Sequence, residues 1–269
     1  DPKMSFRPTV NPFEEHTDYK IASYGLDILQ KEHTKPFFLA VGLIKPHLPF
    51  DAPKPFFDAL PQTILAPELN EDDLKDIPNE GNNFRRVGEF NKITNQNAWS
   101  DVRKAYLACI SWTDYNVGRV LDALKNSPYA KNTVVVLWSD HGFHLGEKMS
   151  FKKFTLWEEA TRVPFIIHDL RDTKHTEGRI VDQPVSLINI YKTVSEMAGF
   201  QTPEYVDGIS LVPLLNDSNT KLEAPAIISW GRGNYAVRTK DWRYIRYYDG
   251  TEELYNHTND KNEWNNLAD

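Results

Sequence analysis

The chain has a single cysteine among its 269 residues, and this scarcity excludes several kinds of site. One thiol cannot form an internal disulfide, and it cannot build a zinc site that needs several cysteine ligands. Cys109 lies in the apolar stretch AYLACISW, which favours a buried structural residue over a nucleophile. A chain with so few thiols is compatible with an oxidising compartment such as the periplasm or the cell surface.

Long apolar runs and an excess of positive charge are also missing. No segment approaches the roughly 20 apolar residues that a membrane-spanning helix requires, and no signal-peptide pattern opens the chain. The formal net charge is −7 at pH 7, which disfavours a general nucleic-acid-binding surface. A local basic pocket remains compatible with this average, and the lysines at positions 45, 148, 152 and 153 are candidates for it.

What is present is typical of a folded domain. Hydrophobic residues make up 40% of the chain and include seven tryptophans, enough for a real core. The 17 prolines and the 26% of charged residues indicate many loops, and the composition argues against disorder. The length fits one large domain, or a large domain and a small one.

Apolar patterns predict the order of the secondary-structure elements. Helices are expected at 17–32, at 101–126 with Ser100 as the N-cap, and at 185–198, where Gly199 ends the helix. Buried strands are expected at 36–44, 133–138 and 162–168. A proline-stiffened loop follows at 45–57, and 61–98 shows little pattern of its own. This order predicts an α/β sheet with flanking helices, with its active site at the carboxyl ends of the strands.

After about residue 200 the chain changes to short aromatic and β-branched segments separated by turns. APAIISW, YAVRTK, WRYIRYY and TEELYN are typical of an antiparallel meander. We therefore predict an α/β domain over 1–200 and a small antiparallel subdomain over 201–269.

The strongest chemical signal is VVVLWSDHGFHLGEKMSFKKF at 134–154, where a β-branched run ends in Asp140 and His141. A carboxylate and a neutral imidazole can share one divalent cation, and Gly142 would let the backbone turn sharply. The alternative is an Asp that only caps the turn beside a His satisfied within its loop. Two ligands are also not a complete metal site. Lys153 lies far enough along the sequence from Asp140 for a loop to bring its ammonium back to the metal. The alternative is that Lys153 is a solvated lysine, like Lys148 and Lys152.

A second candidate is KPHLPF, which holds Lys45 and His47 in a loop stiffened by two prolines. Such a loop fixes a donor in place before a ligand binds. A His that hydrogen-bonds its own loop explains the same pattern.

Together these stretches resemble the sulfatase family of the alkaline-phosphatase-like superfamily, and within it the iduronate-2-sulfatase-like enzymes. The resemblance runs through FFLAVGLIKPHLPFDAPKPFFD, AYLACISWTDYNVGRVLDAL and TVVVLWSDHGFHLGEKMSFKKFTLWEEATRVPFII, then VSLINIYKTVSEMAGF and the closing VRTKDWRYIRYYDGTEELYNHTNDKNEWNNLA. It implies a sulfatase sheet with a small C-terminal antiparallel subdomain. It also implies hydrolysis of a sulfate ester on an acidic sugar or polysaccharide, in a periplasmic, secreted or lysosomal protein.

The resemblance also implies roles for the candidate residues. Asp140 and His141 resemble two ligands of the family's calcium ion, and Lys153 resembles the lysine that contacts the sulfate. His47 resembles the loop histidine that contacts sulfate or the leaving oxygen, which makes it a candidate general acid; Lys45 is a weaker candidate for substrate contact. The family's nucleophile is a formylglycine made from Cys or Ser in a Cys/Ser-x-Pro-x-Arg motif.

That motif is absent from this chain, as is the family's pair of aspartates at the end of its first strand. The first residue here matches a point well after both. We therefore expect a C-terminal portion of a sulfatase, whose partner is the missing N-terminal half, and which alone shows no turnover and binds calcium weakly. The rivals are a phosphonate monoester or phosphodiester hydrolase of the same superfamily, a non-catalytic carbohydrate-binding relative, and a structural α/β domain.

Overall fold

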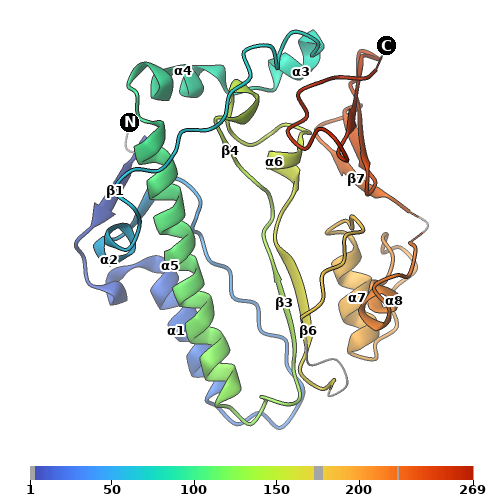
Figure 1. Cartoon of the computed structure of the whole chain (residues 1–269). Coiled ribbons are helices and arrows are strands. Elements are labelled where there is room, and N and C mark those ends of the chain that lie inside the picture. The colour runs from blue at the N-terminus through green and yellow to red at the C-terminus, as the bar shows by residue number, and fades with distance from the viewer. Residues whose placement is uncertain (1–3, 173–177, 223, 269) are drawn as a thin grey trace. The chain divides into compact units, whose positions relative to one another are not determined.

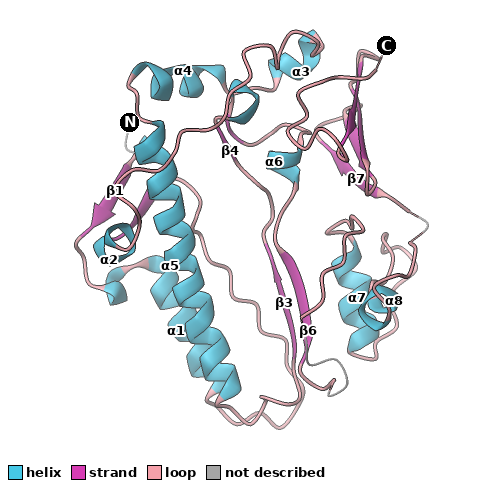
Figure 2. Ribbon diagram, viewed as in Figure 1, coloured by secondary structure: helices cyan, strands magenta, loops and turns pink. Residues whose placement is uncertain are grey.

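The computed structural model describes residues 4–172, 178–222 and 224–268 (Figure 1). The chain divides into two compact units. Unit 1 comprises Asp1–Pro67, Asn91–Val135 and Asp169–Arg171; unit 2 comprises Glu68–Phe90, Val136–His168 and Asp172–Asp269. The chain mixes helices and strands, as the sequence predicts, and carries an antiparallel sheet at its C-terminal end (Figure 2).

Two helices form the body of unit 1: α1 (Thr17–Leu29) and the 27-residue α5 (Trp99–Lys125) run side by side (Figure 1). Ala22 on α1 and Ala105 and Ala108 on α5 are fully buried, and Arg119 on α5 donates to Ser23 Oγ on α1 at 2.7 Å. Beside α5 lies a parallel pair of strands, β1 (Phe6–Thr9) and β2 (Phe50–Pro53), in which Phe6 is paired with Phe50. The short elements η2 (Phe13–Glu15) and α2 (Lys54–Asp58) complete the unit.

The structure corrects two predictions in this unit. Ser100 does not cap α5: it lies inside the helix, and its hydroxyl accepts a hydrogen bond from the backbone N–H of Ile64 (3.1 Å). Residues 36–44 run without forming a strand, because in the described part of the chain they pair with no other strand. Their apolar side chains are accordingly open, and Phe38 is 81% exposed.

The strands β3 (Val134–Trp138) and β6 (Phe165–Asp169) pair with each other, as neighbours in a two-stranded sheet. Ser139 N–H donates to Pro164 O, and Leu170 N–H donates to Thr133 O, so the two strands run in opposite directions. Both lie where the sequence places buried strands, yet Trp138 and Ile166 are 47% and 57% exposed. The apolar run predicts the strand correctly, but burial requires neighbours that these two strands do not supply by themselves.

Unit 2 contains the hairpin β4 (His144–Leu145) and β5 (Phe151–Lys152), connected by η3 (Glu147–Met149) and followed by α6 (Glu158–Thr161). Its C-terminal sheet has the order β10-β9-β8-β7. These strands comprise Glu252–Asn256, Trp242–Arg246, Tyr235–Arg238 and Ala226–Ser229, in the same order. All three pairings are antiparallel, which confirms the predicted meander.

The core of unit 2 surrounds a buried carboxylate. Glu253 accepts hydrogen bonds from Trp157 Nε1 (2.7 Å), Tyr247 Oη (2.7 Å) and Tyr255 Oη (2.6 Å). Apolar residues close around this group: Ile77, Leu156, Ala236 and Ile245. Three donors offset the cost of removing the carboxylate from water, so the polar centre is compatible with a packed core.

The remaining helices are short. α3 (Asn79–Asn83) and α4 (Val87–Asn95) lie in the region where little structure is expected, and α8 (Val212–Asn216) follows α7 (Asn189–Met197). α7 confirms the helix expected at 185–198, and Gly199 ends it with φ +75°, a conformation that suits glycine. Among the described residues, no helix combines the length and apolarity needed to cross a membrane.

Candidate active site

The turn after β3 brings Asp140, His141 and Gly142 against the start of α6. Gly142 N–H donates to Ala160 O at 2.9 Å. A Cβ atom on Gly142 would lie 2.0 Å from the carbonyl oxygen of Glu159, so no side chain fits there. The glycine of this motif is therefore required by close backbone approach, and not by the unusual turn geometry that the sequence suggests.

Three of the predicted site residues lie together in unit 2. Lys153 Nζ lies 2.8 Å from His141 Nε2, and an Asp140 carboxylate oxygen lies 3.6 Å from the same nitrogen. The Asp140 side chain is 83% exposed and that of His141 27% exposed. Partial burial lowers the pKa of Lys153, opposed by the charge of Asp140 and aided by Lys152. The group is thus a carboxylate, an imidazole and an ammonium that meet at the protein surface.

The hydrogen bonds of His141 fix the chemistry that its ring can offer. Its Nδ1 lies 2.8 Å from Gly142 O, an acceptor only, so Nδ1 carries the proton and donates. Nε2 then presents its lone pair toward Lys153 and Asp140. A histidine that ligates a metal commonly donates its other ring N–H to a backbone carbonyl in this way. Asp140 and His141 therefore fit as two ligands of a divalent cation.

The β4–β5 hairpin carries the chain from His141 to Lys153, with His144 paired to Lys152. His144 is completely buried, and its Nε2 lies 2.7 Å from Thr155 Oγ1, which ties the two ends of the hairpin together. Burial lowers the pKa of His144 to about 4. A neutral, buried imidazole thus supports the segment that presents Lys153, a role that the sequence pattern does not reveal.

The structure corrects the interpretation of Lys148 as a solvated charge. Its side chain is 2% exposed, it pairs with Asp73 at 2.6 Å, and it donates to the backbone carbonyl of Glu263. The aromatic rings of Trp157 and Tyr255 lie 5.6 and 5.0 Å from its ammonium. Lys148 is a core residue because partners distant in sequence surround it. Lys152 stays partly exposed and pairs with Glu89 at 2.8 Å.

The other two predicted residues, Lys45 and His47, lie in unit 1 in the loop before β2. His47 is exposed, and its Nδ1 lies 2.8 Å from Leu48 O, which leaves Nε2 as the unprotonated nitrogen. Lys45 is mostly buried; its ammonium pairs with Asp51 and donates to Pro49 O (2.5 Å). Lys45 thus has an internal partner, whereas His47 faces outward.

Asp18, which the sequence analysis did not single out, holds this loop in place. Its carboxylate is 3% exposed and accepts hydrogen bonds from the backbone N–H groups of Ile44 (2.8 Å) and Lys45 (3.0 Å). Thr113 on α5 donates its hydroxyl proton to Lys45 O at 2.8 Å. The loop that bears His47 is therefore anchored to both long helices of unit 1.

Cys109 is a structural residue, as predicted. It is fully buried on α5, and its thiol donates to Asp51 O with Sγ at 3.6 Å. Burial raises the pKa of the thiol to about 12, far from the range of a reactive thiolate.

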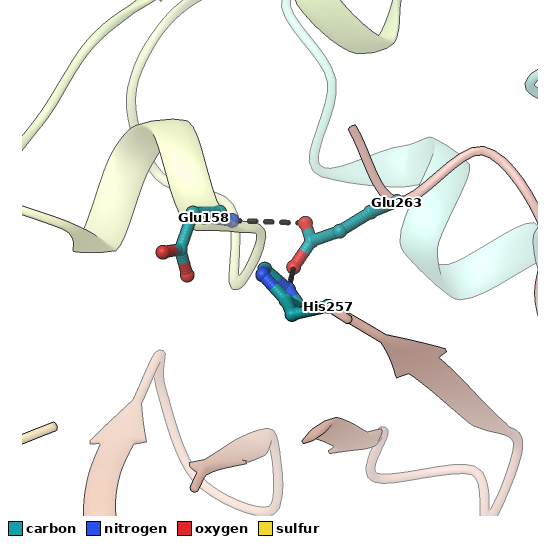
Figure 3. Close-up of side chains that lie close together, drawn as sticks. All are labelled: Glu158, His257 and Glu263. Atoms are coloured by element: carbon teal, nitrogen blue, oxygen red, sulfur yellow. Dashed lines mark hydrogen bonds and ion pairs between the residues drawn. The ribbon is translucent and has the colours of Figure 1, made fainter. Parts of the chain in front are cut away.

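A second cluster of potential metal ligands lies in unit 2, where Glu158, His257 and Glu263 approach one another (Figure 3). Glu263 pairs with His257 Nε2 at 2.8 Å and with Arg243 Nε at 2.6 Å, and Arg243 and Arg238 both pair with Glu158. Although burial acts to raise the pKa of Glu158, these two guanidinium groups hold it at about 2. Two arginines already neutralise the carboxylates, so we interpret the cluster as an ion-pair network that fastens the C-terminal segment.

Unit 1 has a surface groove of about 480 Å³ at the ends of α1 and α5, bordered by Leu26, Leu29 and Arg119. None of the predicted site residues lines it. The groove therefore does not belong to the candidate active site.

Family models match most of the chain. Residues 2–200 match the model described as Sulfatase, and residues 146–269 match N-sulphoglucosamine sulphohydrolase, C-terminal. A protein named Sulfatase from Formosa agariphila is 42% identical over 255 residues, which cover 93% of this chain and 50% of that protein. Human Arylsulfatase K is 28% identical, over 97% of this chain and 55% of its own length. The chain thus spans about half the length of the curated relatives it matches.

Solved structures show the same fold. One of these structures was determined in complex with its substrate D-glucosamine-2-N,6-O-disulfate. It is 20% identical to this chain with a TM-score of 0.73, and the match covers 94% of this chain and 65% of that protein. The phosphonate monoester hydrolase of Agrobacterium radiobacter has a TM-score of 0.74 and 21% identity, and the match covers 99% of this chain and 59% of the hydrolase. The fold is therefore the alkaline-phosphatase-like α/β fold, which hosts more than one chemistry.

Proposed function

Because the chain belongs to the sulfatase family, we propose that it is the C-terminal part of a sulfuric ester hydrolase that removes sulfate from a sulfated sugar or polysaccharide, such as a uronate-containing glycan. The observation that carries this proposal is the approach of Lys153 Nζ to 2.8 Å from His141 Nε2, with Asp140 beside them. An ammonium next to two cation ligands suits a dianionic or monoanionic oxyanion bound at a metal. In this proposal, residues 1–200 belong to the catalytic domain and 201–269 form the small subdomain.

Asp140 and His141 are proposed to hold one divalent cation, which when bound would polarise a sulfate oxygen. The resemblance points to Ca²⁺. An imidazole ligand is less usual for that ion, which prefers oxygen, so metal analysis of the purified protein is the direct check. The exposed carboxylate of Asp140 and the unprotonated Nε2 of His141 are the supporting features.

Lys153, His47 and Lys45 are the proposed substrate contacts. The Lys153 ammonium would neutralise sulfate charge; burial lowers its pKa, and the neighbouring charge of Asp140 opposes that shift. His47 would act as the acid in its doubly protonated form, giving the Nε2 proton to the leaving oxygen while Nδ1–H stays engaged with Leu48 O. Lys45 is the weaker candidate, since its ammonium already pairs with Asp51.

The nucleophile is proposed to be a formylglycine in a preceding segment. No Cys/Ser-x-Pro-x-Arg motif occurs in these residues, and the single cysteine is buried in a helix. A missing N-terminal half would also cover the open apolar side chains on 36–44, β3 and β6, such as Phe38, Trp138 and Ile166. We place the whole protein in the periplasm, outside the cell or in the lysosome.

The test compares the chain alone with the chain joined to its preceding segment, using sulfate release from 4-nitrophenyl sulfate and from a sulfated uronate disaccharide. We expect no turnover by the chain alone and turnover by the joined protein. In the joined protein, Lys153→Ala should lower kcat/KM by about 10²–10³-fold, whereas Lys240→Ala, a change at an exposed lysine, serves as the control. Robust release by the chain alone would refute the proposed division of the site.

Phosphonate ester hydrolysis is the second candidate, since a solved phosphonate monoester hydrolase shares this fold. The ratio of kcat/KM on matched aryl sulfate and aryl phosphonate esters separates the two. A ratio in favour of the phosphonate would replace the sulfatase proposal. Absence of turnover on both, with retained sugar binding, would indicate a non-catalytic relative.

A further inference from the structure

Beside Lys153, the surface of unit 2 carries a pair of aromatic rings. The centroids of Phe154 and Trp230 lie 4.7 Å apart, with the ring planes tilted by 31°. Both residues are 37% exposed, so part of the aromatic surface of the pair is open to solvent. The Lys153 ammonium lies 5.6 Å from the centre of the Phe154 ring and 2.8 Å from His141 Nε2. The aromatic pair is therefore continuous with the candidate active site.

A guanidinium completes this surface. Arg86 is exposed, and its Cζ lies 5.3 Å from the centre of the Phe154 ring. Its backbone is fixed, because Arg86 N–H donates to Ser150 Oγ at 3.1 Å and the neighbouring Arg85 guanidinium donates to Lys148 O (2.8 Å) and Met149 O (2.9 Å). Arg86 is thus an exposed cation on an ordered turn, with its guanidinium over the Phe154 ring and its charge acting on the Glu89 carboxylate.

The backbone under this surface is strained. Lys152 has φ +74° and Phe154 has φ +77°, in the left-handed region that residues with a Cβ rarely adopt. The pairing of β4 with β5 and the contact of Lys152 with Glu89 at 2.8 Å hold this conformation. Strain of this kind gathers where a side chain has to be presented in one direction. In this segment it directs Lys153 toward His141 while Phe154 lies against Trp230.

We propose that Phe154, Trp230 and Arg86, which we name the sugar wall, form a subsite for an anionic sugar ring next to the scissile sulfate. The inference rests on the proposed function and names the substrate contacts that the motif residues do not supply. The C–H face of a pyranose packs on the exposed aromatic surface by dispersion and apolar burial. The planar guanidinium of Arg86 suits a carboxylate or a second sulfate on that ring.

A mere packing role for these residues predicts no effect on ligand binding, and this separates the two explanations. All three lie in unit 2, so binding can be measured with the 269-residue chain itself, independently of turnover. The probe is a heparin-derived disaccharide that carries a 2-O-sulfated uronate, measured by isothermal titration and by saturation-transfer NMR. Its desulfated and its carboxyl-reduced forms report which anionic group Arg86 contacts.

We expect Trp230→Ala and Phe154→Ala each to raise Kd by about tenfold and to weaken saturation transfer to the sugar ring protons. Trp242→Ala is the matched control, because Trp242 is 41% exposed in the same unit and lies outside the sugar wall. Arg86→Gln should raise Kd for the parent disaccharide by about tenfold. It should hardly change Kd for whichever form, desulfated or carboxyl-reduced, lacks the anionic group that Arg86 contacts. Arg246→Gln, a change at an exposed arginine, is its control.

Unchanged Kd in Arg86→Gln, Phe154→Ala and Trp230→Ala, with native circular dichroism, would overturn the subsite. Arg86→Gln alters an exposed side chain, so it remains informative if an aromatic variant fails to fold. Failure of the proposed function gives a different result, namely no release of sulfate by the joined protein while binding still depends on the sugar wall.

Discussion

Replacing Asp18 by Asn tests how the loop with His47 is held. The carboxylate of Asp18 is buried and accepts two backbone hydrogen bonds, from Ile44 at 2.8 Å and from Lys45 at 3.0 Å. Asparagine keeps one acceptor oxygen but turns an NH₂ group toward the second N–H, so one bond is lost and two donors oppose each other. A hydrogen bond to a charged group contributes about 1.5–3 kcal/mol, and an unsatisfied buried donor costs a similar amount.

We therefore expect Asp18→Asn to weaken the anchoring of the loop by about 2–3 kcal/mol, since the hydroxyl of Thr113 still holds Lys45 O. Local opening then becomes about 30- to 150-fold more frequent, because 1.4 kcal/mol corresponds to a factor of ten. Amide hydrogen exchange of Ile44 and Lys45, read residue by residue with NMR, measures this opening directly.

The matched control is Asp27→Asn, the same change at an exposed position of the same helix, for which no altered exchange of the loop is expected. If Ile44 and Lys45 keep their protection in Asp18→Asn, the carboxylate does not anchor the loop and the reasoning is refuted. If both amides exchange freely in the unmodified chain, the bonds themselves are absent in solution.

Three further predictions concern unit 2. Gly142→Ala should destabilise the unit by several kcal/mol and separate Lys153 from His141, because the new Cβ would lie 2.0 Å from Glu159 O. The expected readouts are a lower midpoint of urea unfolding and changed NMR chemical shifts of the Lys153 and His141 side chains. An unchanged midpoint would contradict the prediction. Burial lowers the pKa of His144 from 6.5 to about 4, so the unfolded chain binds more protons between these values, and about 3 kcal/mol of stability should be lost as pH falls from about 6.5 toward 4. His144→Leu should remove that part of the pH dependence of unfolding, and an equally steep profile in the variant would assign it to other groups. Glu158→Gln should cost about 3 kcal/mol, since it removes the carboxylate shared by Arg238 and Arg243 and leaves Glu263 as the remaining charged partner of Arg243. Glu252→Gln, at an exposed pair, should cost about 1 kcal/mol or less by the same urea assay.

Local patterns in the sequence were sufficient for the longer helices and for the C-terminal meander. Apolar spacing predicts α1, α5 and α7, and the glycine at 199 marks the end of α7 because its backbone adopts φ +75°. Alternating aromatic and β-branched residues predict the C-terminal meander, whose pairing depends on neighbouring segments joined by short turns. These features depend on residues that are close together in the sequence, so a short stretch of sequence is enough to predict them.

Long-range contacts were not predictable in the same way. The segment 36–44 has the composition of a buried strand, but a strand exists only where another backbone pairs with it. Lys148 stands among lysines and glycines that indicate solvent, and yet Asp73, 75 positions earlier, takes its charge into the core. Asp18 carries no motif at all, because its partners lie 26 and 27 positions further along the chain.

For the candidate site, the sequence by itself determined the chemical types: a carboxylate and an imidazole at the end of a strand, a lysine beyond them, and a histidine in a stiff loop. Only the tertiary structure decided that Lys153 meets His141 at 2.8 Å, which His141 nitrogen bears the proton, and that Gly142 is required by the backbone of α6. The physical reason is that residue type fixes what a group can donate, accept or ligate. The neighbours supplied by folding decide which of those capacities is in use.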